Sequence, residues 1–136
     1  MKKIVVVTGS RKWRAKGTIF RALGAEQPDL VIHGGAYGAD KIAQEWCEMM
    51  GVQFLEVSPD YRSTLYSAVK APLVRNIEMA RIVQGLQLAG AEVVVLAFPL
   101  PGSRGTPHMM GVCARMGFAV FNCLPSSGPI PPASSR

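Results

Sequence analysis

The feature that most constrains the fold of this chain is a strict alternation of apolar runs with segments of helical spacing. Short runs rich in β-branched side chains predict five strands, at residues 3–8, 30–33, 52–57, 93–98 and 118–123. Apolar side chains at helical intervals predict four intervening helices, at residues 17–26, 42–50, 72–88 and 107–116. Several of the runs are apolar throughout instead of alternating, which is typical of strands covered on both faces of a parallel sheet.

This alternation, with mostly short connections, predicts an α/β protein with a Rossmann-like, three-layer, doubly wound parallel sheet. We expect the strand order 3-2-1-4-5, in which the first and fourth strands lie side by side where the winding reverses. Ligands of such sheets bind at that point, outside the carboxyl ends of the strands. The loops after residues 3–8 and 93–98 should therefore open on one crevice.

The length and composition place the chain among globular proteins of one domain. Its 136 residues are 49% apolar and 18% charged, which suffices for a core. Residues 125–136 are rich in Pro and Ser without a core-forming pattern, so we predict a domain at 1–124 and a flexible tail. The sequence has neither a run of 18 apolar residues nor a secretory signal pattern, so we expect a soluble, cytoplasmic protein away from membranes.

The net charge of +6 comes mainly from basic residues near the amino terminus. A basic loop at the end of a strand suits a phosphate-bearing ligand, and no DNA-reading motif accompanies it, so a nucleic-acid partner is disfavoured. Cys47, Cys113 and Cys123 lack CxxC spacing and lie in apolar surroundings, so they are expected to be buried free thiols. His33 and His108 lie on separate segments without a third ligand at suitable spacing, so we predict no metal site. We expect no bound cofactor.

The loop at residues 101–106, which reads Pro-Gly-Ser-Arg-Gly-Thr, follows the fourth apolar run. Thr106 is the predicted N-cap of the next helix, and Pro107 is its predicted first residue. Such a start leaves backbone N–H groups at the positive end of the helix dipole, where phosphate binds.

A second loop, Gly9-Ser10-Arg11, ends the first predicted strand. Ser10 and Arg11 either contact a ligand there, or Arg11 is a solvated surface charge. Trp13 has two interpretations as well: it stacks on a base of the ligand, or it covers the edge of the core.

A third loop, after the second predicted strand, carries Gly34, Gly35 and Gly38, followed by Asp40. Glycines let the backbone approach a ligand or adopt positive φ. The spacing matches neither the GxGxxG fingerprint nor a Walker A loop. Asp40 either caps the next helix and favours its dipole, or it binds a hydroxyl group or acts as an acid or base.

The connection at residues 58–71 is longer than a usual strand-to-helix loop and is therefore either functional or locally helical. Arg75 and Asn76 follow it, early in the helix predicted at 72–88. A guanidinium near a helix start is well suited to bind a phosphate or a carboxylate. The alternative is an exposed Arg75 that pairs with Glu78.

Four motifs in this order resemble the SLOG superfamily, and within it the small stand-alone group found in bacteria and their phages. They read Val7-Thr8-Gly9-Ser10-Arg11-x-Trp13, His33-Gly34-Gly35-x-x-Gly38-Ala39-Asp40, Arg75-Asn76-x-x-Met79 and Pro101-Gly102-x-x-Gly105-Thr106. The resemblance implies a domain that binds a nucleotide or a nucleotide-derived small molecule, with its phosphate on the Gly105-Thr106 turn beside Arg75. The candidate ligand-binding residues are Gly9, Ser10, Arg11, Trp13, Gly34, Gly35, Gly38, Asp40, Arg75, Asn76, Gly102, Ser103, Arg104, Gly105 and Thr106.

The resemblance also separates three hypotheses of function. In the related cytokinin-activating phosphoribohydrolases the loop reads PGGxGTxxE, and its Glu is the acid or base that acts on the N-glycosidic bond. Met109 matches that position and cannot transfer a proton, which favours a binding protein, namely a sensor, receptor or sponge. The alternative is a hydrolase in which Asp40, Asp60 or Glu78 takes over the proton transfer. DNA binding is the third hypothesis.

Two further expectations follow from this resemblance. Arg14 stands where the stand-alone group usually has an acidic residue, and Arg104 adds a charge within the phosphate loop, which together favour a strongly anionic ligand. The relatives and the apolar helices predict a homodimer or a larger homo-oligomer.

Overall fold

The structure is a computed structural model that describes residues 2–124. Its strands form an all-parallel sheet in the order β3-β2-β1-β4-β5, which confirms the predicted fold class and strand order. The strands are β1 (Lys3–Gly9), β2 (Leu30–His33), β3 (Gln53–Glu56), β4 (Glu92–Phe98) and β5 (Ala119–Asn122). The helices are α1 (Lys16–Glu26), α2 (Ala39–Met50), α3 (Ala71–Leu88) and α4 (Gly105–Arg115), with a short 3-10 helix at Ala68–Lys70. The tail predicted at 125–136 lies outside the described residues.

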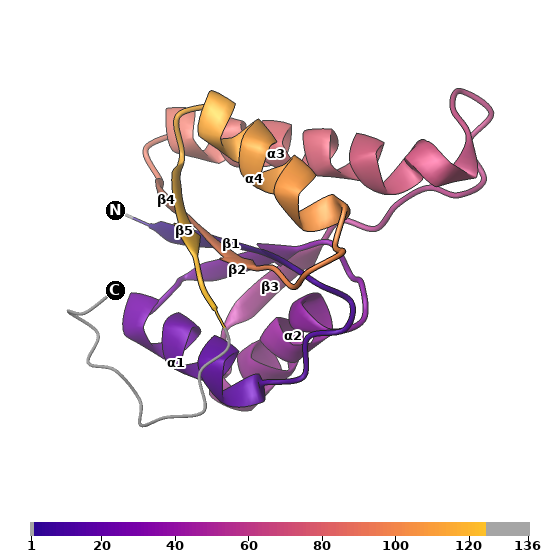
Figure 1. Cartoon of the computed structure of the whole chain (residues 1–136). Helices are drawn as coiled ribbons and strands as arrows, with labels where there is room; N and C mark the ends of the chain where they lie inside the picture. The colour runs from indigo at the N-terminus through magenta and orange to yellow at the C-terminus, as the bar shows by residue number, and fades with distance from the viewer. Residues whose placement is uncertain (1, 125–136) are drawn as a thin grey trace.

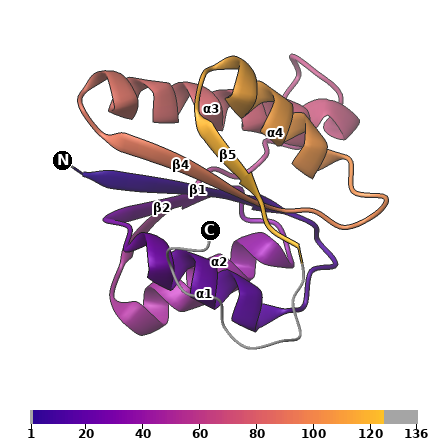
Figure 2. The same ribbon diagram turned by 60° about the vertical axis from the view of Figure 1, so that its left-hand side comes forward.

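Each face of the sheet is covered by two helices, α1 and α2 on one side and α3 and α4 on the other (Figure 1, Figure 2). The side chains of β1 alternate between the two cores. Val5 and Val7 belong to the cluster on the α1–α2 side, whereas Ile4 and Val6 belong to the cluster on the α3–α4 side. The run is apolar throughout because both of its faces are buried. Within residues 2–124, we find no helix whose length and apolar character would allow it to span a bilayer.

The central strand β1 pairs with β2 on one side and with β4 on the other, so the winding of the sheet reverses between β1 and β4. At the carboxyl end of this pair Gly9 lies opposite Phe98, and the backbone N–H of Ser10 donates to the Phe98 carbonyl at 2.9 Å. The loops after β1 and β4 therefore leave the sheet next to each other, as the sequence predicted.

Two helices begin earlier than their apolar spacing predicted. The helix α4 begins at Gly105 instead of Pro107. The helix α2 begins at Ala39, before the first apolar residue of its pattern at 42, and Asp40 lies in its first turn as predicted. The first residues of both helices are small or polar, so the apolar spacing starts only after the helix has begun. The long connection at 58–71 is locally helical at its end, where the 3-10 helix leads into α3.

The cysteines are free thiols, as predicted. Cys47 and Cys113 are buried as predicted, one in each of the two core clusters. The predicted burial of Cys123 is wrong, because this residue follows the edge strand β5 and is partly exposed. Burial raises the pKa of Cys47 to about 11 and that of Cys113 to about 12. These two groups are therefore inert packing residues at neutral pH.

Candidate functional site

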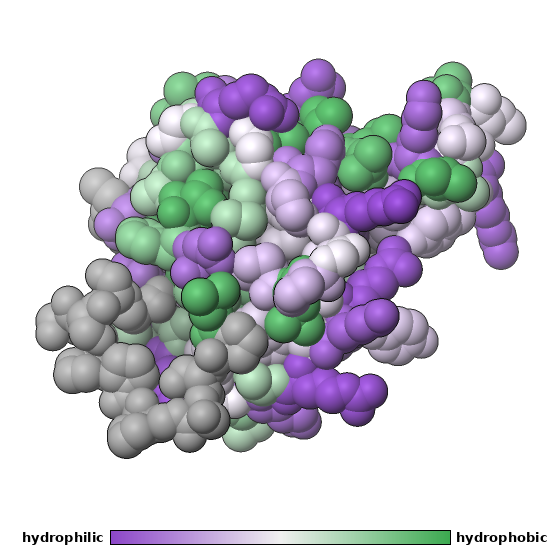
Figure 3. Space-filling view, viewed as in Figure 1, coloured by the Kyte–Doolittle hydropathy of each residue, from purple (hydrophilic) through white to green (hydrophobic). Residues whose placement is uncertain are grey.

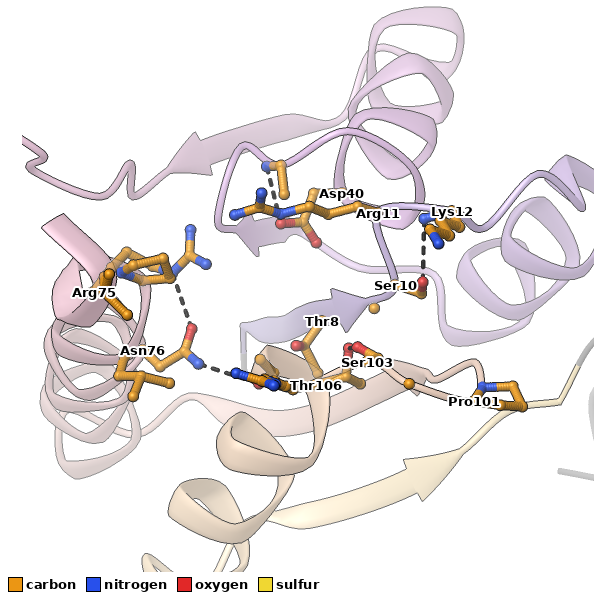
Figure 4. Close-up of a pocket in the computed structure, with 18 residues that line it drawn as sticks. Thr8, Ser10, Arg11, Lys12, Asp40, Arg75, Asn76, Pro101, Ser103 and Thr106 are labelled. Atoms are coloured by element: carbon orange, nitrogen blue, oxygen red, sulfur yellow. Dashed lines mark hydrogen bonds between the residues drawn. The ribbon is translucent and has the colours of Figure 1, made fainter.

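A cavity of about 420 Å³ lies where β1 and β4 end (Figure 4). Its volume is in the usual range of small-molecule sites. It is lined by residues from the end of β1, from the loops after β1, β2 and β4, from the 3-10 helix and from the starts of α2, α3 and α4: Thr8, Gly9, Ser10, Arg11, Lys12, Ala36, Asp40, Val69, Pro72, Leu73, Arg75, Asn76, Pro101, Gly102, Ser103, Arg104, Gly105 and Thr106. The two predicted loops do meet around one crevice.

The electrostatic character of the cavity is basic. Arg11, Lys12, Arg75 and Arg104 line it, with Asp40 as its one acidic residue. Figure 3 shows hydrophilic side chains gathered on the right-hand side of the molecule, over the edge of the sheet where β1 and β4 finish. This arrangement favours an anionic ligand.

The loop after β4 brings the start of α4 to the cavity. Gly102 adopts a φ of 85°, and the chain then turns into the helix at Gly105. The predicted N-cap at Thr106 is wrong, because Thr106 lies inside the helix and its hydroxyl group contacts the Ser103 hydroxyl at 3.0 Å. The helix has no side-chain cap, so its first backbone N–H groups stay available at the positive end of the dipole.

The loop after β1 is organised by Ser10. Its hydroxyl group accepts a hydrogen bond of 3.1 Å from the Lys12 backbone N–H, and its carbonyl accepts from the N–H groups of Trp13 and Ala39 at 3.2 Å. These bonds tie the loop to the start of α2 and direct the exposed side chains of Arg11 and Lys12 to the cavity.

Trp13 belongs to the core, which was the second of its two interpretations. Only 2% of its surface is exposed, and its ring packs edge-on against Phe98 with the centroids 5.4 Å apart. Its indole N–H donates to the Ala15 carbonyl at 2.9 Å. The predicted stacking of Trp13 on a ligand base is wrong, because the ring is buried and does not line the cavity.

Asp40 is buried in the first turn of α2, with 4% of its surface exposed. Its Oδ2 accepts hydrogen bonds from the backbone N–H groups of Gly34 at 3.1 Å and Ala36 at 3.2 Å, so it holds the loop after β2 and does not cap the helix. Its Oδ1 is buried without a hydrogen-bond partner. Burial raises the pKa of Asp40 to about 6, against the opposing effects of its backbone partners and of Arg75.

The glycines of the loop after β2 make room for other parts of the protein. A Cβ on Gly34 would collide with the guanidinium of Arg75, and one on Gly38, where φ is 79°, would collide with the Ser10 carbonyl. Neither residue, nor Gly35, lines the main cavity. These glycines act on the cavity by letting Arg75 and the loop after β1 approach. Direct contact between the glycines and a ligand stays a prediction.

Arg75 and Asn76 form the part of the site that comes from α3. Both are buried, and Arg75 has only 8% of its surface exposed. Its Nε donates to the Asn76 Oδ1 at 2.9 Å, and its Nη1 donates to the carbonyls of Gly34 and Val57. The alternative of an exposed Arg75 paired with Glu78 is wrong, because none of the described ion pairs involves either residue.

Asn76 links this arginine to α4. Its Nδ2 donates to the Gly105 carbonyl at 3.3 Å and lies 3.1 Å from the His108 Nδ1. His108 had been considered only as a metal ligand, and nothing in its sequence context pointed to this contact. No group of three or more His, Cys, Asp or Glu residues in the described part of the chain could hold a metal ion.

Several lining residues were missed, and two of the three candidate carboxylates are misplaced. Val69, from the 3-10 helix, and Pro72 and Leu73, from the first turn of α3, line the cavity. The unusual length of the 58–71 connection was the only signal for Val69. Asp60 and Glu78 are exposed and lie outside the cavity lining, so Asp40 is the candidate acid or base that faces it.

Comparison with known proteins adds to this geometry. Residues 3–63 match the family described as YAcAr: YspA, cpYpsA-related SLOG family. The chain is 39% identical over 125 residues to the Gene 61 protein of Mycobacterium phage D29, a match that covers 87% of this chain and 94% of the relative. Similar solved structures include DNA processing protein A from Streptococcus pneumoniae, with 16% identity and a TM-score of 0.44 over 90% of this chain and 59% of that one. The molybdenum cofactor carrier protein MCP from Chlamydomonas reinhardtii is 18% identical, with a TM-score of 0.39 over 90% of this chain and 91% of that one.

Proposed function

Because this chain belongs to the YspA, cpYpsA-related SLOG family, we propose that its cavity binds a nucleotide or a nucleotide-derived small molecule, and that the protein acts as a sensor, receptor or sponge. SLOG proteins generally bind ligands of this class. The observation that carries the proposal is the convergence of two loops, a helix start and four basic side chains on one cavity with a single carboxylate.

The phosphate of the ligand would bind at the start of α4. The uncapped first turn offers backbone N–H groups, Ser103 and Thr106 add hydroxyl groups, and Arg104 adds a positive charge. The cavity wall opposite carries the buried guanidinium of Arg75, which is held in place by three hydrogen bonds and loses little entropy when it binds an anion.

Asp40 would bind a hydroxyl group of the ligand sugar. Its Oδ1 is a buried acceptor without a hydrogen-bond partner, and Asp40 is one of the residues that line the cavity. A buried polar atom in that position is costly unless a donor reaches it. A ribose hydroxyl group is such a donor, and only a few covalent bonds separate it from the phosphate of the same ligand.

Hydrolysis of an N-glycosidic bond is the second candidate function, and the raised pKa of Asp40 favours it. A carboxyl group that titrates near pH 6 can transfer a proton at neutral pH. Met109 is fully buried and does not line the cavity, so it takes no part. In this case Asp40 would take a proton from the water that attacks the anomeric carbon while the bond from that carbon to the base nitrogen breaks. The protonated Asp40 would then return the proton to the departing base.

Binding and turnover can be separated in one experiment. The protein is incubated with nucleoside monophosphates, cyclic nucleotides and NAD derivatives, and the melting temperature and the release of free base or ribose phosphate are followed together. Stabilisation without product supports the binding protein, and released base supports the hydrolase. If neither occurs with any ligand, the proposal fails. Steeply salt-dependent binding to DNA oligonucleotides in their place would indicate the third hypothesis.

Matched arginine variants test where the ligand binds. Arg104→Ala and Arg11→Ala each remove an exposed cationic side chain from the cavity lining and should weaken binding about tenfold, as expected for a charged hydrogen bond. Arg14→Ala removes the same charge from an exposed position outside the lining and should leave the affinity unchanged. An equal loss of affinity in all three variants would indicate that binding depends only on the net charge of the protein.

Self-association also stays a proposal. Ile77 and Ile82 of α3 are exposed apolar side chains, with 37% and 41% of their surfaces accessible. We place the interface of the predicted homodimer or larger oligomer on this helix. Ile77→Glu combined with Ile82→Glu should then shift the mass measured by light scattering to that of a monomer, whereas a wild-type monomer would exclude the oligomer.

A further inference from the structure

A second cavity of about 300 Å³ adjoins the first and shares Arg11, Ala36 and Arg75 with it. We propose that this second cavity receives an aromatic ring of the same ligand, so that the preferred ligand has two ring-bearing halves joined through phosphate. The inference rests on the proposed function and narrows its ligand class from nucleotides in general to dinucleotide-like molecules.

The second cavity carries the aromatic side chains that the first lacks. Tyr37 and Tyr61 line it, and they are 81% and 53% exposed. Tyr37 comes from the loop after β2, and Tyr61 comes from the long connection before α3. Exposed aromatic rings at the mouth of a cavity provide stacking surfaces that any nucleobase can use.

The floor of the second cavity suits a flat ring. Gly34, Gly35, Ala36, Ser58 and Pro59 are among the residues that line it. These residues are small or compact, so a planar group can lie close to the backbone while its face meets a tyrosine ring.

The junction between the two cavities is formed by two arginines. Figure 4 shows the side chains of Arg11 and Arg75 reaching toward one another, from the loop after β1 and from α3. Neither is part of any ion pair described for residues 2–124. The hydrogen bonds of Arg75 use Nε and Nη1, so its Nη2 is left for a ligand. Two facing guanidinium groups repel each other unless an anion lies between them, and a bridging phosphate meets that need.

The two adjoining cavities therefore provide three consecutive binding positions for one ligand. A sugar and its phosphate lie in the first cavity between Asp40 and the start of α4, a linking phosphate lies between Arg11 and Arg75, and a second ring lies against the tyrosines. A mononucleotide fills only part of this path. A ligand with a ring at each end fills all of it.

The test compares ligands that differ only in the second ring. For each of the four common bases, the affinity of the 5′-monophosphate, the 5′-diphosphate and the symmetric 5′,5′-dinucleoside diphosphate is measured by calorimetry. The diphosphate provides similar phosphate groups without a second ring. We expect the dinucleotide of the best base to bind about tenfold more tightly than the diphosphate, the gain typical of one stacked base.

Tyrosine variants identify the origin of that gain. Tyr37→Ala and Tyr61→Ala should each reduce it at least threefold while the affinity for the monophosphate is unchanged, and Tyr37→Phe and Tyr61→Phe should retain it because the ring is kept. Tyr66→Ala is the matched control, since Tyr66 lies in the same connection as Tyr61 and lines neither cavity.

The possible failures are distinct. If mononucleotides bind but the dinucleotide gains nothing, or if its gain survives both alanine variants, the second cavity is not a ring site and the inference is overturned while the proposed function stands. If neither mononucleotides nor dinucleotides bind, the proposed function itself fails, and the inference fails with it.

Discussion

Arg75 and Asn76 are consecutive residues of α3, and a hydrogen bond of 2.9 Å joins the Nε of the first to the Oδ1 of the second. Asn76 donates in turn to the Gly105 carbonyl at the start of α4, and Arg75 donates to the Gly34 carbonyl after β2. The pair thus ties three elements together at the cavity. Because it is buried, it supports the fold and the proposed ligand site at the same time.

Asn76→Ala should lower the free energy of unfolding by about 2–3 kcal/mol, because it leaves the buried Nε of Arg75 without its partner and removes the hydrogen bond to the Gly105 carbonyl. Urea unfolding at pH 7 measures the change. Asn122→Ala, at an exposed position of β5, is the control and should have little effect. A loss below 0.5 kcal/mol, a threshold taken from typical surface substitutions, would show that the pair does not support the fold.

Arg75→Ala should weaken binding of a phosphate-bearing ligand by about 1.5–3 kcal/mol, the range expected for a charged hydrogen bond. The same change removes the hydrogen bonds to Gly34 and Val57, so the free energy of unfolding must be measured alongside the affinity. Arg75→Lys keeps the charge but loses the planar fork, and it should recover only part of the affinity. An affinity unchanged in both variants would refute the placement of Arg75 at the ligand.

Ser103 and Thr106 should be energetically coupled, because their hydroxyl groups lie 3.0 Å apart. In a double-mutant cycle with Ser103→Ala and Thr106→Val, we expect a coupling free energy of about 0.5–1.5 kcal/mol in thermal or urea unfolding. Thr106→Val keeps the shape of the buried side chain, so packing is preserved. Strictly additive losses would mean that the two hydroxyl groups do not interact in solution.

The free energy of unfolding should depend on pH through Asp40. Burial raises its pKa from 3.8 to about 6, so the folded protein holds this proton more tightly than the unfolded chain does. The resulting stabilisation is complete below pH 3.8 and is lost as the pH rises through 6. His33 has the opposite effect, because burial lowers its pKa to about 4, so its contribution is present above pH 6.5 and is lost as the pH falls through 4.

Asp40→Asn isolates the first of these effects. An amide keeps an oxygen that can accept from the N–H groups of Gly34 and Ala36, while His33 is common to both proteins and cancels. The difference in the free energy of unfolding, wild type minus variant, should fall by roughly 2 kcal/mol between pH 4 and 6.5. Parallel pH profiles for the two proteins would show that Asp40 titrates normally.

Much of the fold was accessible from the sequence, because it depends on the pattern of side chains within each segment. Apolar runs such as 93–98 need cover on both faces, and their alternation with helices leaves few topologies other than the doubly wound sheet. Once β1 and β4 were expected to be neighbours, the convergence of Gly9 and Gly105 on one crevice followed. That the residues of this crevice bind a ligand stays a prediction.

The roles of individual side chains were decided only by the tertiary structure. The sequence by itself determined the strand order and the edge of the sheet where the cavity lies, because these follow from local apolar patterns and chain connectivity. It did not determine that Trp13 is buried, that Asp40 holds a loop while one oxygen stays unpaired, or that Arg75 reaches a carbonyl 41 residues away. An indole, a carboxylate and a guanidinium each have several partners of similar energy, and only the packing of segments distant in the sequence decides which partner is within reach.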